Sequence, residues 1–94
     1  GETQGGPRNP DEAKKLYAEV AGQYPGTVGA EESLIRLGNL QFDGGKHHEA
    51  IATFGSYLTS YPRGHFRVMA GIGKAYAEEA KGDLARAILL LTSG

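Results

Sequence analysis

The chain contains no cysteine, which excludes disulfide bonds, thiol catalysis and thiolate metal sites. Its charge is nearly balanced, with ten Lys and Arg residues against eleven Asp and Glu. Because no basic stripe is present, binding to nucleic acid is not expected. The longest apolar run, Ala87–Leu91, is too short to cross a bilayer, so no direct membrane insertion is expected. These absences leave one small soluble domain with no cofactor.

Apolar residues recur at helical spacing, and no segment of useful length alternates with a period of two. Asn9 can cap a first helix and Thr27 a second, which Gly44-Gly45 should end. Gly82-Asp83 should separate the last two helices. The sequence therefore predicts an all-α fold of about five antiparallel helices, over approximately 10–24, 29–42, 46–61, 65–80 and 84–92.

The predicted helices repeat one another in sequence. Ala13, Ala50 and Ala87 recur at one constant interval, and Tyr24-Pro25 matches Tyr61-Pro62 at the same interval. The even-numbered helices also match, in the pairs Leu34 and Met69, Leu37 and Ile72, and Gly38 and Gly73. A glycine inside a helix costs about 0.5–1 kcal/mol relative to alanine, which makes sense where a neighbouring helix packs too closely for a Cβ. Such repeats predict stacked helix pairs that share a continuous core.

The segment LIRLGNLQ…GGKHHEAIATF…YP resembles the tetratricopeptide repeat (TPR), whose pattern is W-x2-L-G-x2-Y…A-x3-F…P. The positions that match are Leu34, Leu37, Gly38, Gln41, Ala50, Phe54 and Pro62. A second copy places Met69, Ile72, Gly73, Tyr76, Ala87 and Leu91 in the same core positions. The resemblance implies a TPR-type superhelix over 9–94, made of half a repeat (9–28), a full repeat (29–64) and a truncated repeat (65–94). Residues 1–8 are predicted to be a disordered arm or an expression remnant.

The resemblance also implies a non-enzymatic scaffold that binds a peptide or protein partner in a concave groove. The partner-binding residues would be Ile35, Arg36, Asn39, Phe42, Arg67, Ala70, Lys74 and Ala77. Ile35 and Phe42, which lie off the predicted core face, would anchor an apolar side chain, while the basic members would prefer acidic groups. Asn39 matches the asparagine of the carboxylate-clamp subfamily, but Ile35 and Gly71 replace its basic residues.

A second hypothesis is self-association through the last helix. Leu89 and Leu90 lie beside the predicted core face of Leu84–Leu91. This leaves apolar surface that a further repeat or a second copy of the chain would cover. The chain could therefore form a homodimer through this region.

A third hypothesis is an enzyme or metal site built from His47, His48 and His65. Adjacent residues on a helix diverge by about 100°, so His47 and His48 cannot easily face one metal ion. We expect a half-buried His47 beside an exposed His48, and we expect Glu31-Glu32 and Glu78-Glu79 to be solvated. No catalytic or metal-binding residue is predicted.

The run F-x-x-Y-L-x-x-Y-P at Phe54–Pro62 is similar to bacterial envelope members of the TPR family. These include the periplasmic coordinator associated with the Tol–Pal system and the lipoprotein of the outer-membrane β-barrel assembly machine. The similarity implies a periplasmic or cell-envelope location, with the cytoplasm as the alternative.

Overall fold

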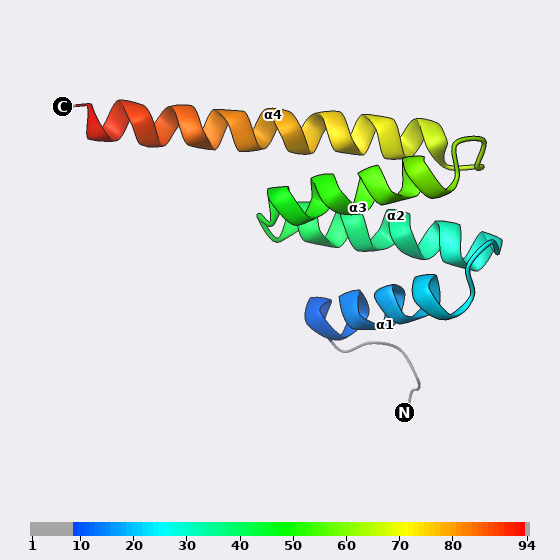
Figure 1. Ribbon diagram of the computed structural model, residues 1–94. Helices are drawn as coiled ribbons and strands as arrows, with labels where there is room; N and C mark the ends of the chain where they lie inside the picture. The colour runs from blue at the N-terminus through cyan, green and yellow to red at the C-terminus, as the bar shows by residue number, and fades with distance from the viewer. Residues whose placement is uncertain (1–8, 94) are drawn as a thin grey trace.

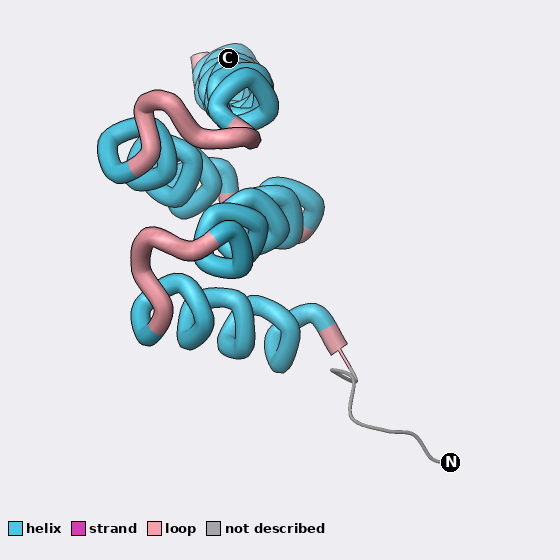
Figure 2. The backbone as a smooth tube through the Cα atoms, turned by 90° about the vertical axis from the view of Figure 1, so that its right-hand side faces the viewer, coloured by secondary structure: helices cyan, strands magenta, loops and turns pink. Residues whose placement is uncertain are grey.

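The computed structural model describes residues 9–93. These residues form four α-helices and no strand: α1 (Pro10–Gln23), α2 (Val28–Asp43), α3 (His47–Ser60) and α4 (Arg67–Thr92). Successive helices run antiparallel (Figure 1), and α3 lies to one side of α2 and α4 when the stack is viewed end-on (Figure 2). The all-α prediction is confirmed, whereas the predicted arm at 1–8 lies outside the described residues.

The first two helices begin at the predicted caps. The Asn9 side chain accepts a hydrogen bond of 2.9 Å from the backbone N–H of Glu12. The Thr27 hydroxyl accepts one of 3.1 Å from the N–H of Ala30. Each cap satisfies an amide group that has no partner within its own helix, so local sequence chemistry is sufficient to set these two starts.

The prediction of five helices is wrong, because α4 continues through Gly82-Asp83 as one helix of 26 residues. At the break after α2, Gly45 adopts a φ of 80°, and the N–H of Lys46 donates to the carbonyl of Gln41 at 2.8 Å. No glycine of α4 has a positive φ. One glycine inside a helix costs only about 1 kcal/mol relative to alanine, which is too little to end it alone. The second half of α4 therefore projects beyond the other helices (Figure 1).

Phe54 of α3 occupies the centre of the core and is 1% exposed. A Cβ built on Gly38 of α2 would lie 2.6 Å from the Phe54 ring, and one built on Gly73 of α4 would lie 2.7 Å from it. Real Cβ atoms do not approach so closely, so both glycines are needed for the ring to fit between the two helices. The prediction that these glycines permit close packing is confirmed.

A buried polar network holds the loop between α3 and α4 against α2. The Tyr57 hydroxyl donates to Glu31 Oε1 at 2.7 Å, and the N–H of His65 donates to the same oxygen at 3.1 Å. The N–H of Phe66 donates to the Tyr57 oxygen at 2.8 Å. A Cβ at Gly64 would collide with both Tyr57 and Glu31. The network thus positions the start of α4.

The same network overturns one prediction about the surface. Glu31 was expected to be solvated, but it is 8% exposed because the Tyr57 hydroxyl and the loop cover it. Burial raises the pKa of the Tyr57 phenol, and its hydrogen bond to Glu31 raises this pKa further. Glu78 and Glu79 are exposed, as predicted.

Candidate functional site

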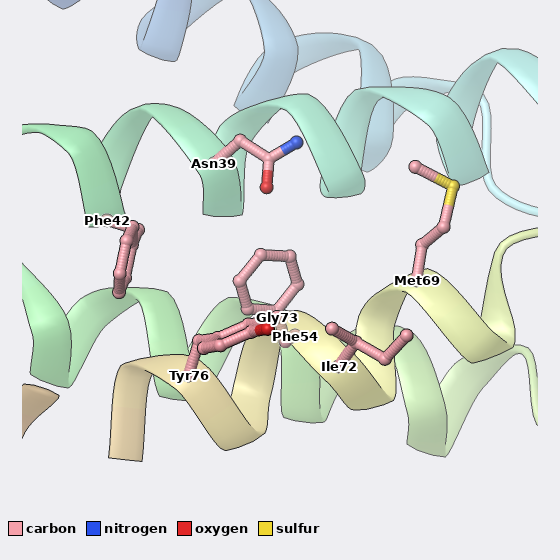
Figure 3. A pocket seen from close by; sticks show the side chains of 7 residues that line it. All are labelled: Asn39, Phe42, Phe54, Met69, Ile72, Gly73 and Tyr76. Carbon is pink, nitrogen blue, oxygen red and sulfur yellow. The ribbon is translucent and has the colours of Figure 1, made fainter. Parts of the chain in front are cut away.

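A cavity of about 480 Å³ lies between α2 and α4, beside the ring of Phe54 (Figure 3). Its lining residues are Asn39 and Phe42 from α2, Phe54 from α3, and Met69, Ile72, Gly73 and Tyr76 from α4. We call this site the α2–α4 groove. Apart from the Asn39 amide and the Tyr76 hydroxyl, the side chains around it are apolar. The groove can therefore bury an apolar group.

The α4 side of the groove is open to solvent. Met69, Ile72 and Tyr76 are each more than half exposed, although the repeat pattern predicts that they belong to the core. That prediction is wrong because the segment that should cover them continues along α4 instead of folding back. Among residues 9–93, no other segment takes its place as a covering helix. In the part of the chain that the structure describes, this apolar face of α4 therefore has no helix packed on it.

Three of the predicted groove residues lie in the core instead. Ile35 is buried, and so are Ala70 and Ala77. Ile35 is covered because it belongs to the buried cluster that joins α2 to α3 and α4, where Phe54 and Tyr57 of α3 are also found. The two alanines belong to the same buried cluster as Phe54 of α3. Their predicted position on the surface is therefore wrong.

Asn39 and Phe42 do line the groove, as the sequence predicts for surface residues of the second helix. Asn39 is exposed and Phe42 is half-buried. Figure 3 shows Asn39 and Phe42 on α2, across the groove from Met69, Ile72 and Tyr76 on α4. The α4 residues that line the groove (Met69, Ile72, Gly73 and Tyr76) differ from those predicted for it. The helical spacing of Met69, Ile72 and Tyr76 is evident in the sequence, but it predicted that they pack in the core and not that they lie on an open face.

The predicted basic residues already have partners within the chain. Arg36 donates two hydrogen bonds, of 2.9 and 2.7 Å, to Glu32, and these bonds raise the pKa of the guanidinium. Lys74 pairs with Glu78 at 3.0 Å. Arg67 donates to a backbone carbonyl of the preceding loop at 3.2 Å. An acidic group placed near these side chains would compete with the contacts they already make.

The histidines do not form a site. His47 is half-buried with its ring centroid 5.5 Å from that of Phe42, and His48 is exposed, as predicted. Within the described part of the chain, no group of three or more His, Asp or Glu side chains could hold a metal ion. The α2–α4 groove also has no titratable cluster at its lining.

The 26 residues of α4 would be long enough to cross a bilayer, but the helix is not apolar enough. Among residues 9–93, no helix combines enough length with enough apolar character to cross a bilayer. The apolar residues of α4 are interrupted by charged ones, including Lys81, Asp83 and Arg86.

Residues 32–64 match the family model described as Tetratricopeptide repeat. This range covers most of α2 and all of α3, including Gly38 and Phe54. Comparison with curated proteins and with solved structures gave no match. TPR repeats generally mediate protein–protein interactions, and proteins that carry them are generally non-catalytic. The match and the stack of antiparallel helices together support the tetratricopeptide repeat family for this chain.

Proposed function

We propose that this protein is a non-enzymatic interaction scaffold that holds a segment of a protein partner in the α2–α4 groove. The observation that carries the proposal is the exposed row of Met69, Ile72 and Tyr76 beside a cavity of about 480 Å³. Contiguous apolar surface of this kind marks interaction sites in globular domains, and concave apolar pockets are the usual binding sites.

The groove is suited to a side chain that enters between the two helices. Its inner wall is the buried ring of Phe54, which packs so closely between Gly38 and Gly73 that a Cβ on either residue would collide with it. A rigid wall loses little conformational entropy when a ligand binds. Phe42 is the anchor on the α2 side because it is apolar and only half-buried.

The charged residues have a lesser role in this proposal. Arg36 and Lys74 each form an ion pair within α2 or α4 at the exposed surface. Charges at the rim of an interface mainly affect the association rate and its dependence on salt. We therefore propose that the partner is selected by its apolar side chains, with acidic groups on the partner as a secondary preference.

The proposal can be tested without a known partner. Peptides are selected from a randomised library against the wild-type protein, and the affinity of the best binder is then measured for two variants. Tyr76→Lys places a charge at the groove, whereas Ala52→Lys places one on an exposed position of α3 that is not part of the groove. We expect at least a tenfold loss of affinity for Tyr76→Lys and little change for Ala52→Lys. Equal affinity in both variants would place the binding surface elsewhere.

We also propose a periplasmic or cell-envelope location, which is supported by the Tyr-Pro run of Phe54–Pro62. Fractionation of the source cells tests this proposal. Recovery of the protein with the cytoplasmic fraction would contradict it.

A further inference from the structure

The two ends of α4 carry complementary halves of one helix pair. Residues 84–92 repeat the sequence pattern of α3, with Ala87, Ile88 and Leu91 at the positions of Ala50, Ile51 and Phe54. We call this segment the donor. The start of α4 repeats the pattern of α2, and its Met69, Ile72, Gly73 and Tyr76 form the acceptor. Within the chain, α3 packs against α2. A donor should pack against an acceptor in the same way.

In one chain the donor cannot reach its own acceptor. Both lie on one continuous helix, which rises about 1.5 Å per residue, so Met69 and Leu91 are roughly 33 Å apart. The donor and the acceptor are also both exposed to solvent. Leu84, Ile88 and Leu91 of the donor are each more than half exposed, as are Met69, Ile72 and Tyr76 of the acceptor.

We propose that a second copy of the chain covers these surfaces, with the donor of each copy seated on the acceptor of the other. The proposal rests on the proposed function, because it treats the α2–α4 groove as a docking site for protein and names its occupant. The two α4 helices would run antiparallel about a two-fold axis. Each copy would then contribute the same surface, so that the contact closes as a dimer.

The positions along α4 fit this arrangement. Its midpoint lies next to Ala80, so an antiparallel pair centred there overlaps along the whole helix. This register places Leu84 opposite Tyr76 of the second copy and Leu91 opposite Met69. Ala87 lies opposite Gly73, where two small residues allow the helices to approach closely. Leu84, Ile88 and Leu91, the apolar face of the donor, therefore each meet an apolar residue of the acceptor.

The alternative occupant is the donor of the same chain, folded back onto its own acceptor. That arrangement requires a break at Gly82-Asp83. The break at Gly44-Gly45 depends on a positive φ at Gly45, whereas Gly82 keeps helical geometry and Asp83 pairs with Arg86 within the helix at 3.2 Å. Exchange between two copies keeps α4 intact, which is how domain-swapped dimers form.

The absence of cysteine allows a direct test by disulfide trapping. The variant Met69→Cys/Leu91→Cys is oxidised and separated by non-reducing electrophoresis. A disulfide requires Cα atoms within about 7 Å, a distance that one straight helix does not allow between these residues. We expect a covalent dimer. The matched control Val68→Cys/Leu91→Cys places its first thiol on a neighbouring exposed residue outside the acceptor, and it should form the dimer at least tenfold more slowly.

Each other outcome overturns the proposal. An oxidised monomer with no free thiol would show that the donor folds back within one chain. Equal trapping by both variants, or none by either, would show that the helices do not pair in this register. Sedimentation of the wild-type chain provides a second measurement, in which we expect a dimer that Leu84→Glu/Leu91→Glu weakens at least tenfold. A monomeric chain whose groove still binds a library peptide would refute the dimer and leave the proposed function intact, whereas a chain that does neither would refute both.

Discussion

The ring of Phe54 lies against the backbone of Gly73, in the space that a Cβ at residue 73 would need. A Cβ there would be 2.7 Å from the ring, and the ring is too deeply buried to move aside. This contact joins α3 to α4, and both residues line the α2–α4 groove. The stability of the stack and the shape of the groove therefore depend on the same pair of residues.

Two neighbouring glycines of α4 should respond to alanine with opposite signs. Gly73→Ala should destabilise the protein by about 1–3 kcal/mol because it overpacks the contact with Phe54. Gly71 has no neighbouring atom within 4 Å of an added Cβ, so Gly71→Ala should stabilise by about 0.5–1 kcal/mol through helix propensity. Urea unfolding measures both changes. Loss of stability in both variants would contradict this description of the contact.

A large residue at Ala50 should unfold the domain. Ala50 is fully buried in the core cluster, and overpacking of this kind typically costs about 1–3 kcal/mol, a large share of a small domain's stability. We expect Ala50→Phe to abolish most of the cooperative thermal unfolding transition, whereas the melting temperatures of His47→Ala and His48→Ala should stay close to that of the wild type. If thermal melts ranked either histidine variant as the more damaging, the repeat alignment would be wrong.

The phenol of Tyr57 should make stability depend on alkaline pH. Burial raises its pKa in the folded state, so the fold favours the neutral phenol. This contribution is fully present below the unfolded pKa of about 10 and is lost as the pH rises through the folded pKa. At neutral pH, Tyr57→Phe should cost about 1–3 kcal/mol, because Glu31 loses a donor and the N–H of Phe66 loses its acceptor.

Urea unfolding at pH 8 and near pH 11 measures this effect. The difference in stability between the wild type and Tyr57→Phe should shrink at the higher pH. There the phenol of the unfolded wild type ionises more readily than that of the folded protein, which lowers the stability of the wild type, whereas Tyr57→Phe has no phenol at this position. Tyr24→Phe is a suitable control, since Tyr24 is mostly exposed. A Tyr57 difference that stayed constant across this range would contradict the proposed network.

Protection from hydrogen exchange should fall along α4. Ala70 and Ala77 are fully buried against the stack, whereas residues 84–92 are exposed throughout. The helix also begins without a side-chain cap at Phe66. At concentrations where the chain is monomeric, amide exchange should be slowest in α3, intermediate in the first half of α4 and fastest in the second half. Uniform protection along α4 would be inconsistent with this gradient.

Features that depend on local chemistry were predictable from the sequence. The caps at Asn9 and Thr27 need only a side chain and a nearby amide group. Gly38 and Gly73 stood out because a glycine inside a helix is costly unless a neighbour packs closely, and Phe54 is that neighbour. The repeat of these positions was sufficient to predict an all-α stack.

Features that depend on distant contacts were not predictable. Glu31 is buried by Tyr57 and His65, which lie far along the chain. Ile35 is buried in a cluster with residues of α3 and α4, which also lie far along the chain. Whether a helix ends at Gly82 depends on a small free-energy difference, because one glycine inside a helix costs only about 1 kcal/mol relative to alanine. The open side of the groove follows from that difference. This is why the exposure of Met69 and Tyr76 on α4 could not be predicted from the sequence.

We propose that apolar contact in the α2–α4 groove holds the partner. The most direct test is titration of Phe42→Ala and Lys74→Ala with a library-selected peptide at two salt concentrations, after circular dichroism has shown unchanged helical content. Truncation of a buried anchor commonly costs about 2 kcal/mol or more, roughly a thirtyfold loss of affinity. We expect a loss of this size for Phe42→Ala at both salt concentrations, and for Lys74→Ala a smaller change that fades at high salt. Full affinity in the double variant Phe42→Ala/Arg67→Ala would contradict the claim and place the binding site outside the groove.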